Sequence, residues 1–168
     1  MRLIITTLMV AAVSLAACGK TEDGGKPAVT ATPGGYTVKN EDGSATVSTG
    51  AQAAAAAASG LPDYAPLFPG AKVENTISTV SSEGGDAEGA TVTYTVDVAP
   101  VKVIDFYKDR ARTAGFKTQM DANMGAALMF VASDEATKRG LQVIASGKGE
   151  SASVVVTWAR PKGPQVGG

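Results

Sequence analysis

The chain contains no histidine, a single cysteine and few aromatic residues: four phenylalanines, four tyrosines and one tryptophan among 168 residues. Without histidine it lacks the usual acid–base group at neutral pH and the commonest metal ligand. Neither a serine nor a cysteine triad can therefore be assembled. Because Cys18 has no second cysteine to pair with, the chain forms no internal disulfide. We expect a protein that is not an enzyme, needs no cofactor and holds no metal.

Charge is also scarce and evenly balanced. Fifteen Lys and Arg face sixteen Asp and Glu, which leaves a net charge of −1, and charged residues make up 18% of the chain. Nucleic-acid-binding domains carry a clear excess of positive charge. The composition therefore gives no reason to expect a nucleic-acid partner.

The first 17 residues have the pattern of an export signal. Met1 and Arg2 precede an uncharged stretch, Leu3 to Ser14, and small residues follow it. A helix that spans a bilayer needs about 20 apolar residues, and this stretch is shorter. We therefore expect residues 1–17 to be a signal peptide that is removed on export.

The residues Leu15-Ala16-Ala17-Cys18 resemble the lipobox of bacterial lipoproteins. The resemblance implies cleavage between Ala17 and Cys18, a diacylglyceryl group on the Cys18 sulfur and acylation, such as palmitate, at the new amino terminus. Each buried methylene contributes roughly 0.8 kcal/mol, so several acyl chains hold a protein at a membrane. Gly19, where an aspartate would retain a lipoprotein in the inner membrane, implies the outer membrane, facing the periplasm. The alternative is an ordinary secretory signal with a cysteine there by chance.

Residues 18–60 are rich in Gly, Ala, Thr, Ser and Lys and have almost no large apolar side chain. Such a segment buries too little surface to offset the entropy of ordering, so we expect a largely disordered tether behind the lipidated cysteine. Two parts of it have local structure signals. A turn-type cluster at 40–43 separates two alternating segments and favours a hairpin over 36–48. The alanine-rich residues 51–58 favour either a short helix or a flexible spacer.

From Leu61 the composition changes, and residues 61–160 have the pattern of one α+β domain. Leu61-Pro62 and Pro69-Gly70 predict an extended segment that carries Tyr64, Leu67 and Phe68 toward a core. The strongest strand signal is Thr91–Val98, where Val92, Tyr94, Val96 and Val98 alternate with polar residues. Residues 81–89 read as a loop, and residues 161–168 as a disordered tail.

One helix follows that strand. Pro100 lies near its first turn, Gly115 lies just past its end, and apolar residues recur between them at helical spacing. The remaining strands have period two, and glycines in short connections favour antiparallel neighbours. The predicted order is β-β-α-β-β-β-β, an antiparallel sheet of about five or six strands packed on one helix, with strands at 72–79, 91–98, 116–120, 126–132, 141–145 and 153–159.

A second resemblance covers about residues 61–160. Pro69-Gly70-Ala71-Lys72-Val73, then Val103–Lys108 and Ala114-Gly115-Phe116, are similar to a group of uncharacterised exported bacterial proteins with the pattern PGAxV…VIxFYK…AGF. The same positions are those that a sheet and helix core needs. The resemblance therefore supports the fold and implies no activity.

Several charged and polar motifs have a structural explanation. Asp105 and Asp109 lie one helical turn apart, as an acid–base pair would, but lysines and an arginine interleave with them, so we expect a solvated face. Asn40, Asp42 and Gly43 lack the remaining ligands of a calcium loop. The glycine pairs at 84–85 and 147–149 lack the ending of a phosphate loop. We interpret both groups as turns.

Soft-metal and surface-binding motifs are equally incomplete. Met120, Met124 and Met129 are candidate ligands for Cu(I), but their spacing in strands and turns does not place them on one face, so we expect them to fill gaps and loops. Lys138-Arg139, with Lys148, Arg160 and Lys162, form too small a cluster to indicate binding to anionic lipid or cell-wall polymer.

Three functions remain. The first is a non-catalytic interaction or structural module of a lipid-anchored envelope protein, with an envelope protein or cell-wall partner. The second is a ligand-binding lipoprotein with an apolar slot between helix and sheet, lined by Tyr94, Phe106, Phe130 and Trp158. The third is a carboxylate-based hydrolase, which the alternation disfavours because it places Asp97 on the wet face.

Overall fold

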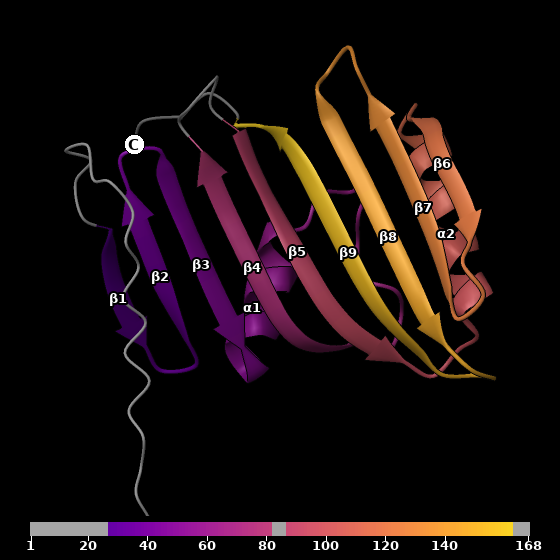
Figure 1. Cartoon of the computed structure of the whole chain (residues 1–168), viewed down its shortest axis with the longest axis horizontal. Coiled ribbons are helices and arrows are strands. Elements are labelled where there is room, and N and C mark those ends of the chain that lie inside the picture. The colour runs from indigo at the N-terminus through magenta and orange to yellow at the C-terminus, as the bar shows by residue number, and fades with distance from the viewer. Residues whose placement is uncertain (1–26, 82–86, 163–168) are drawn as a thin grey trace, which may run out of the picture.

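The computed structural model describes residues 27–81 and 87–162. They form nine strands and two helices (Figure 1): β1 Ala28–Thr32, β2 Gly35–Asn40, β3 Gly43–Thr49, α1 Gly50–Gly60, β4 Lys72–Ser81, β5 Ala87–Val96, α2 Pro100–Thr113, β6 Lys117–Asn123, β7 Ala127–Asp134, β8 Arg139–Gly147 and β9 Ala152–Pro161. Neither helix of these residues is long and apolar enough to cross a membrane.

The strands form one antiparallel sheet in the order β1-β2-β3-β4-β5-β9-β8-β7-β6. It consists of two meanders, β1 to β5 and β6 to β9, and α2 carries the chain from the end of the first to the far edge of the sheet. The last strand then returns to the middle and pairs with β5 over ten residues. This pairing makes one sheet from two halves that are distant in sequence.

Both helices cover the same face of the sheet and lie behind it in Figure 1. We call this the helix face and the opposite one the open face. The apolar residues of the central strands alternate onto the helix face, as period two requires. One registered row there, with partners in neighbouring strands, is fully buried: Thr76, Val92, Val156, Val143 and Phe130.

The order predicted for residues 61–160, β-β-α-β-β-β-β, is confirmed by β4, β5, α2 and β6 to β9. The alternation predicted around Tyr94 is also confirmed, since Val92, Tyr94 and Val96 are buried; β5 ends before Val98. Tyr64 is buried in the segment between α1 and β4, and Leu67 and Phe68 pack against the core, as predicted.

The number of strands is corrected from five or six to nine. The predicted tether is ordered from β1 onward, and the sheet continues across the predicted boundary at residue 61, because β3 pairs with β4 over seven residues. The predicted hairpin is β2 with β3. A segment that extends an existing sheet satisfies its backbone hydrogen bonds on a neighbour, so it does not need a core of its own. The predicted tail, 161–168, is also corrected at its first residue, because β9 includes Pro161.

The alanine-rich segment forms helix α1, which packs on β3 and β4. Ala53 and Ala57, one turn apart, are buried, and the small side chains let the helix approach the sheet closely. The hydroxyl of Thr76 in β4 donates a hydrogen bond of 3.0 Å to the carbonyl of Ala53. Thr76 is itself 1% exposed, so this bond joins helix and sheet away from water.

Helix α2 packs on the other half of the sheet, against β6 to β9. Its buried residues, Val103, Ile104, Tyr107 and Ala111, recur every three to four residues and form one stripe. Pro100 stands at its start, and Gly115, with φ +78°, follows its end, as predicted. The amide of Phe116 donates to the carbonyl of Ala111 and closes the last turn.

The burial of Ala53 can be tested with one substitution at two positions. Ala53→Leu forces extra volume into the closed contact between α1 and β4, and we expect it to lower the free energy of unfolding by about 1–3 kcal/mol. Ala54→Leu, at an exposed position of the same helix, should change stability by less than about 0.5 kcal/mol. Urea unfolding measures both. Equal effects would mean that α1 does not pack on the sheet.

Candidate ligand-binding site

The four residues predicted to line an apolar slot come from β5, α2, β7 and β9, and three of them are core residues. Tyr94, Phe130 and Trp158 are 0%, 1% and 5% exposed, and Phe106 is half-buried. The Phe106 ring meets the rings of Phe68 and Tyr107 edge-on, with centroids about 5 Å apart. We assign these side chains to the core, because they are buried or pack on other aromatic rings. The prediction that they line an open slot is therefore wrong for Tyr94, Phe130 and Trp158.

Two phenols join the helix to the rest of the domain at this centre. The Tyr107 hydroxyl donates to the carbonyl of Pro66 at 2.8 Å, and the two hydroxyls of Tyr94 and Tyr107 lie 3.0 Å apart. Since Tyr107 has only one proton to donate, Tyr94 is the donor to Tyr107. Burial raises the pKa of Tyr94 to about 12 and raises the pKa of Tyr107 further.

The raised pKa of Tyr94 predicts a pH effect on stability. Its phenol keeps its proton to a higher pH when folded, so between pH 10 and about 12 the folded state binds more protons than the unfolded state. Stability therefore falls as the pH rises through this window. Tyr94→Phe has no phenol to titrate, although it loses the hydrogen bond, so its stability deficit against the parent should shrink from pH 10 to 12. Unfolding measured across this range checks it; a constant deficit would contradict it.

Space remains at the amino-terminal end of α2. A cavity of about 210 Å³ opens there between the start of the helix, the β6–β7 turn and β8. Every residue that lines it is apolar or glycine: Ala99, Pro100, Val101, Gly125, Ala126, Ala127, Leu128, Ala145 and Gly147. Small side chains create this space, because four of the nine are alanine and three of the others are proline or glycine.

Two large apolar side chains are exposed beside this cavity. Val101, which lines it, is 52% exposed, and Met124, next to Gly125 in the β6–β7 turn, is 54% exposed. The turn is held in shape by the Met124 amide, which donates to the Ala127 carbonyl, and by the Gly125 amide, which donates to Asn123. An apolar mouth therefore sits on an ordered turn.

The carboxyl-terminal end of α2 has the opposite character. A cavity of about 290 Å³ there is lined by Asp63, Tyr64, Arg110, Thr113, Ala114 and Arg139. The guanidinium of Arg139 lies over the rings of Tyr64 and Phe116 and donates to the carbonyl of Ala114. It also pairs with Asp134 at 2.9 Å. Arg139 thus ties the β7–β8 hairpin to the end of α2.

The carboxylate of Asp134, near this end of α2, accepts several hydrogen bonds. Hydrogen bonds from the Thr137 hydroxyl and from Arg139 lower the pKa of Asp134 to about 2, and the amides of Ala136 and Thr137 add to the effect. A carboxylate held this way stays ionised and has hydrogen-bond partners, so its role is to stabilise the hairpin turn. It offers no proton for acid–base chemistry near neutral pH.

The acidic residues weighed as catalytic candidates lie on the surface, as expected. Asp105 is exposed, Asp109 pairs with Arg112 at 3.0 Å, and Asp97 pairs with Lys72 at 3.0 Å. These carboxylates belong to a solvated helix face and a strand end. Among the described residues, no group of three or more histidine, cysteine, aspartate or glutamate side chains could hold a metal ion.

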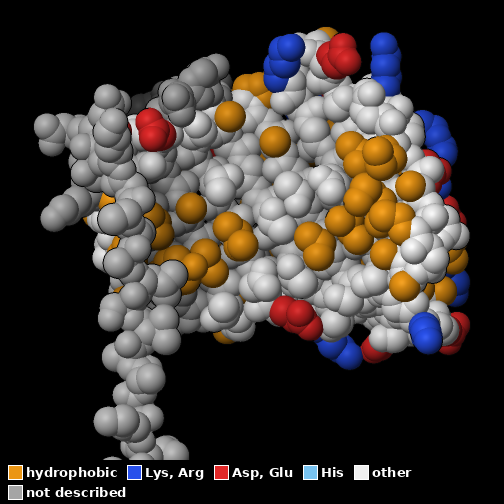
Figure 2. All heavy atoms as spheres, in the orientation of Figure 1, with side chains coloured by type: hydrophobic (Ala, Val, Ile, Leu, Met, Phe, Trp, Pro, Cys, Tyr) orange, Lys and Arg blue, Asp and Glu red, His pale blue; other side chains and the backbone are white. Residues whose placement is uncertain are grey.

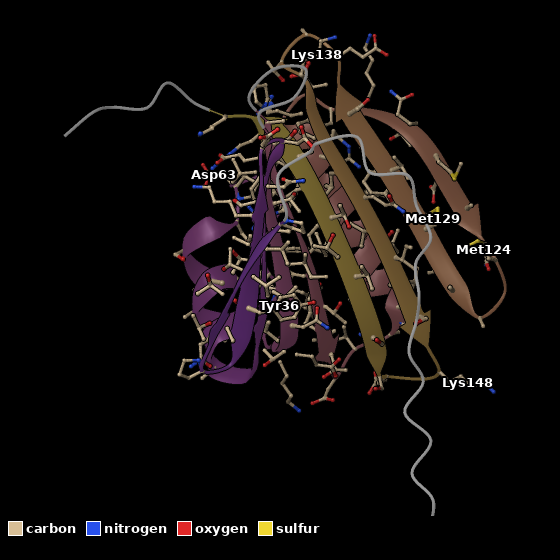
Figure 3. The ribbon with its side chains drawn as sticks, turned by 60° about the vertical axis from the view of Figure 1, so that its left-hand side comes forward. Tyr36, Asp63, Met124, Met129, Lys138 and Lys148 are labelled. Carbon is tan, nitrogen blue, oxygen red and sulfur yellow. The ribbon has the colours of Figure 1, made fainter. Side chains whose placement is uncertain are left out.

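The methionines and the basic residues are spread over the molecule. Met124 lies in the β6–β7 turn and Met129 in β7 (Figure 3). The register places Met129 on the open face with Met120, whereas Met124 lies in the turn, so the three methionines do not come together in one strand face. Lys138 and Lys148 lie at opposite ends of the sheet (Figure 3). Arg160 pairs with Glu88.

Some predictions fall outside the described residues. Cys18, its cleavage partner Ala17 and the whole signal peptide 1–17 lie there, as do residues 82–86 of the predicted 81–89 loop and the end of the tail. The lipidation site therefore stays a prediction.

The cavity at the start of α2 was missed by reasoning from the sequence. The predicted slot was lined by large aromatic residues, whereas small residues, Gly125-Ala126-Ala127 and Ala145, make this space. The signal available was a helix that begins with Pro100-Val101 opposite a turn of glycine and alanine. A gap in side-chain volume across three elements becomes visible only once they are assembled.

The chain was compared with protein families, curated proteins and solved structures. A family model described as START domain-like matches residues 74–161, which run from β4 to the end of β9 and include α2. The match leaves out β1 to β3 and α1. No curated protein and no solved structure matches the chain.

Proposed function

The chain belongs to the START domain-like family, and we propose that its α2 and sheet unit is a non-catalytic ligand-binding module. The ligand presents an apolar group to the cavity at the amino-terminal end of α2. The observation that carries this proposal is that no polar or charged side chain lines that cavity, and that Val101 is exposed at its mouth.

The volume limits what enters. Sites for drug-sized ligands measure about 300–1,000 Å³, and this cavity measures about 210 Å³. It accommodates one short chain or ring of a ligand, while the rest lies over the surface beside Val101 and Met124. No titratable side chain lines it, so the group that enters is uncharged.

Binding without chemistry is supported by the residues near the cavity. The sequence has no histidine to act as a general base, and none of the nine lining residues carries an acid, a base or a nucleophile. The phenols of Tyr94 and Tyr107 are hydrogen-bonded, and burial raises their pKa, so they stay protonated.

A charge at the mouth should weaken binding. Val101→Asp places a carboxylate where the apolar group enters and removes about 1.5 kcal/mol of apolar contact, so we expect the affinity for 1-octanol to fall at least tenfold. Titration of the full mature chain with 1-octanol, followed by the methyl NMR signals of Leu128 and Ala145, measures it.

Val29→Asp is the matched control, because Val29 is 64% exposed and lies on β1, away from the cavity. It should bind 1-octanol like the parent. If the methyl signals of Leu128 and Ala145 do not respond to 1-octanol in the parent, the proposed function fails.

We further propose that the module is held at the outer membrane, facing the periplasm, through acyl chains on Cys18. The resemblance of residues 15–18 to a lipobox supports this. Mass spectrometry of the protein isolated from its own cells should find an amino terminus at Cys18 with the added mass of a diacylglyceryl group and an amide-linked acyl chain. Cys18→Ser should release the protein from the membrane fraction. An unmodified Cys18 in the mature protein would refute the anchor.

A further inference from the structure

The open face of the sheet carries no charge across its central rows. The row through Ile77, Thr91, Thr157, Gln142 and Val131 crosses β4, β5, β9, β8 and β7 without a charged residue. The two neighbouring rows on this face also have no charged residue in β4, β5, β9, β8 or β7. The face of a sheet that contacts water normally carries polar and charged residues. The absence of charge over five strands therefore indicates that this face has another role.

Figure 2 looks directly at this face. Lysines, arginines and acids lie around its margin, while hydrophobic and uncharged polar atoms fill the interior. The exposed large hydrophobic residues Tyr36, Ile77 and Met120 belong to this face by register, and Ile77 is 38% exposed near its middle. Core regions of protein interfaces are depleted in charge in the same way.

The polar groups of the face are mainly hydroxyls. The hydroxyls of Thr91 and Thr157 lie 3.0 Å apart across β5 and β9, and Thr93 and Ser153 continue the same stripe. A hydroxyl both donates and accepts hydrogen bonds. A stripe of hydroxyls is therefore complementary to a copy of itself, whereas a stripe of one charge is not.

The shape of the face includes both knobs and hollows. Two shallow hollows, each about 240 Å³, lie on either side of Ala159. They exist because Gly89, Ala159 and Gly140 are small. No residue larger than glycine fits at position 89 without a shift, because a Cβ there would lie 2.6 Å from the Trp158 carbonyl oxygen. Ile77 borders one hollow and Val131 the other.

We propose that the open face binds a second copy of this chain, sheet against sheet, in a two-fold dimer. In such an interface the same patch meets itself, which requires a face without net charge, with hydroxyls that pair with hydroxyls and with knobs beside hollows. Nine strands at about 4.8 Å spacing and about seven residues each give a face of roughly 1,000 Å². A stable interface buries about 800 Å² per partner, so the area suffices.

The test places a charge at the centre of the face. Sedimentation equilibrium of the mature chain, residues 18–168 with Cys18→Ser to remove the proposed lipid, should show a dimer. Thr157→Lys brings like charges together across the two-fold interface and should raise the dimer dissociation constant at least about 100-fold. Thr113→Lys is the matched control, since Thr113 is exposed on α2, and it should leave the dimer intact.

A measurement on the unsubstituted face guards against a variant that misfolds. The methyl NMR signals of Ile77, Ile144 and Val155 should shift with protein concentration, while those of Val101 should not. A chain that stays monomeric at millimolar concentration overturns the proposal, as does a dimer that survives Thr157→Lys. If the chain is monomeric and Thr157→Lys abolishes crosslinking to a different envelope component in cells, that component is the occupant and the self-association is refuted.

Discussion

The packing of α2 into one face of the sheet is the constraint on which the other features depend. Val103, Ile104 and Tyr107 form a stripe that is 0–2% exposed, and it meets the inward residues of β6 to β9. The Tyr107 hydroxyl then holds the segment before β4 through Pro66. Both described helices pack on this face, so neither of them covers the open face of the central strands.

This one-sided arrangement explains why the two proposed surfaces have different chemistry. On the helix face large side chains fill the middle, and the cavity proposed to bind a ligand lies where small residues cluster at the start of α2. On the open face many side chains are short, with Thr91 and Thr157 in the central row and glycine and alanine in the row beside it. Short side chains leave the backbone near the surface, which allows a second sheet to pack closely on this face.

The sequence predicted well what depends on local periodicity. The alternation around Tyr94 and the helix between Pro100 and Gly115 were assigned correctly because each pattern lies within one element. The tether was assigned wrongly because its residues are small and polar, and the composition rule treats a segment as if it were alone. Strands β1 to β3 owe their order to β4, a partner outside the segment. The four aromatics were identified as facing helix and sheet, but whether they line a space or fill it depends on side-chain volumes from several elements.

The two ends of α2 differ for a reason rooted in helix geometry. The last carbonyls of a helix need donors and carry partial negative charge, and the Arg139 guanidinium donates a hydrogen bond to the carbonyl of Ala114. The cavity at that end is therefore lined by charged and polar side chains. The first turn leaves N–H groups that would normally need acceptors. Pro100 has no N–H to satisfy, and the Lys102 amide donates to the Ala99 carbonyl at 3.0 Å. With fewer free donors there, a cavity lined by apolar side chains costs less at this end than it would at the other, which is consistent with the proposal that an uncharged group enters it.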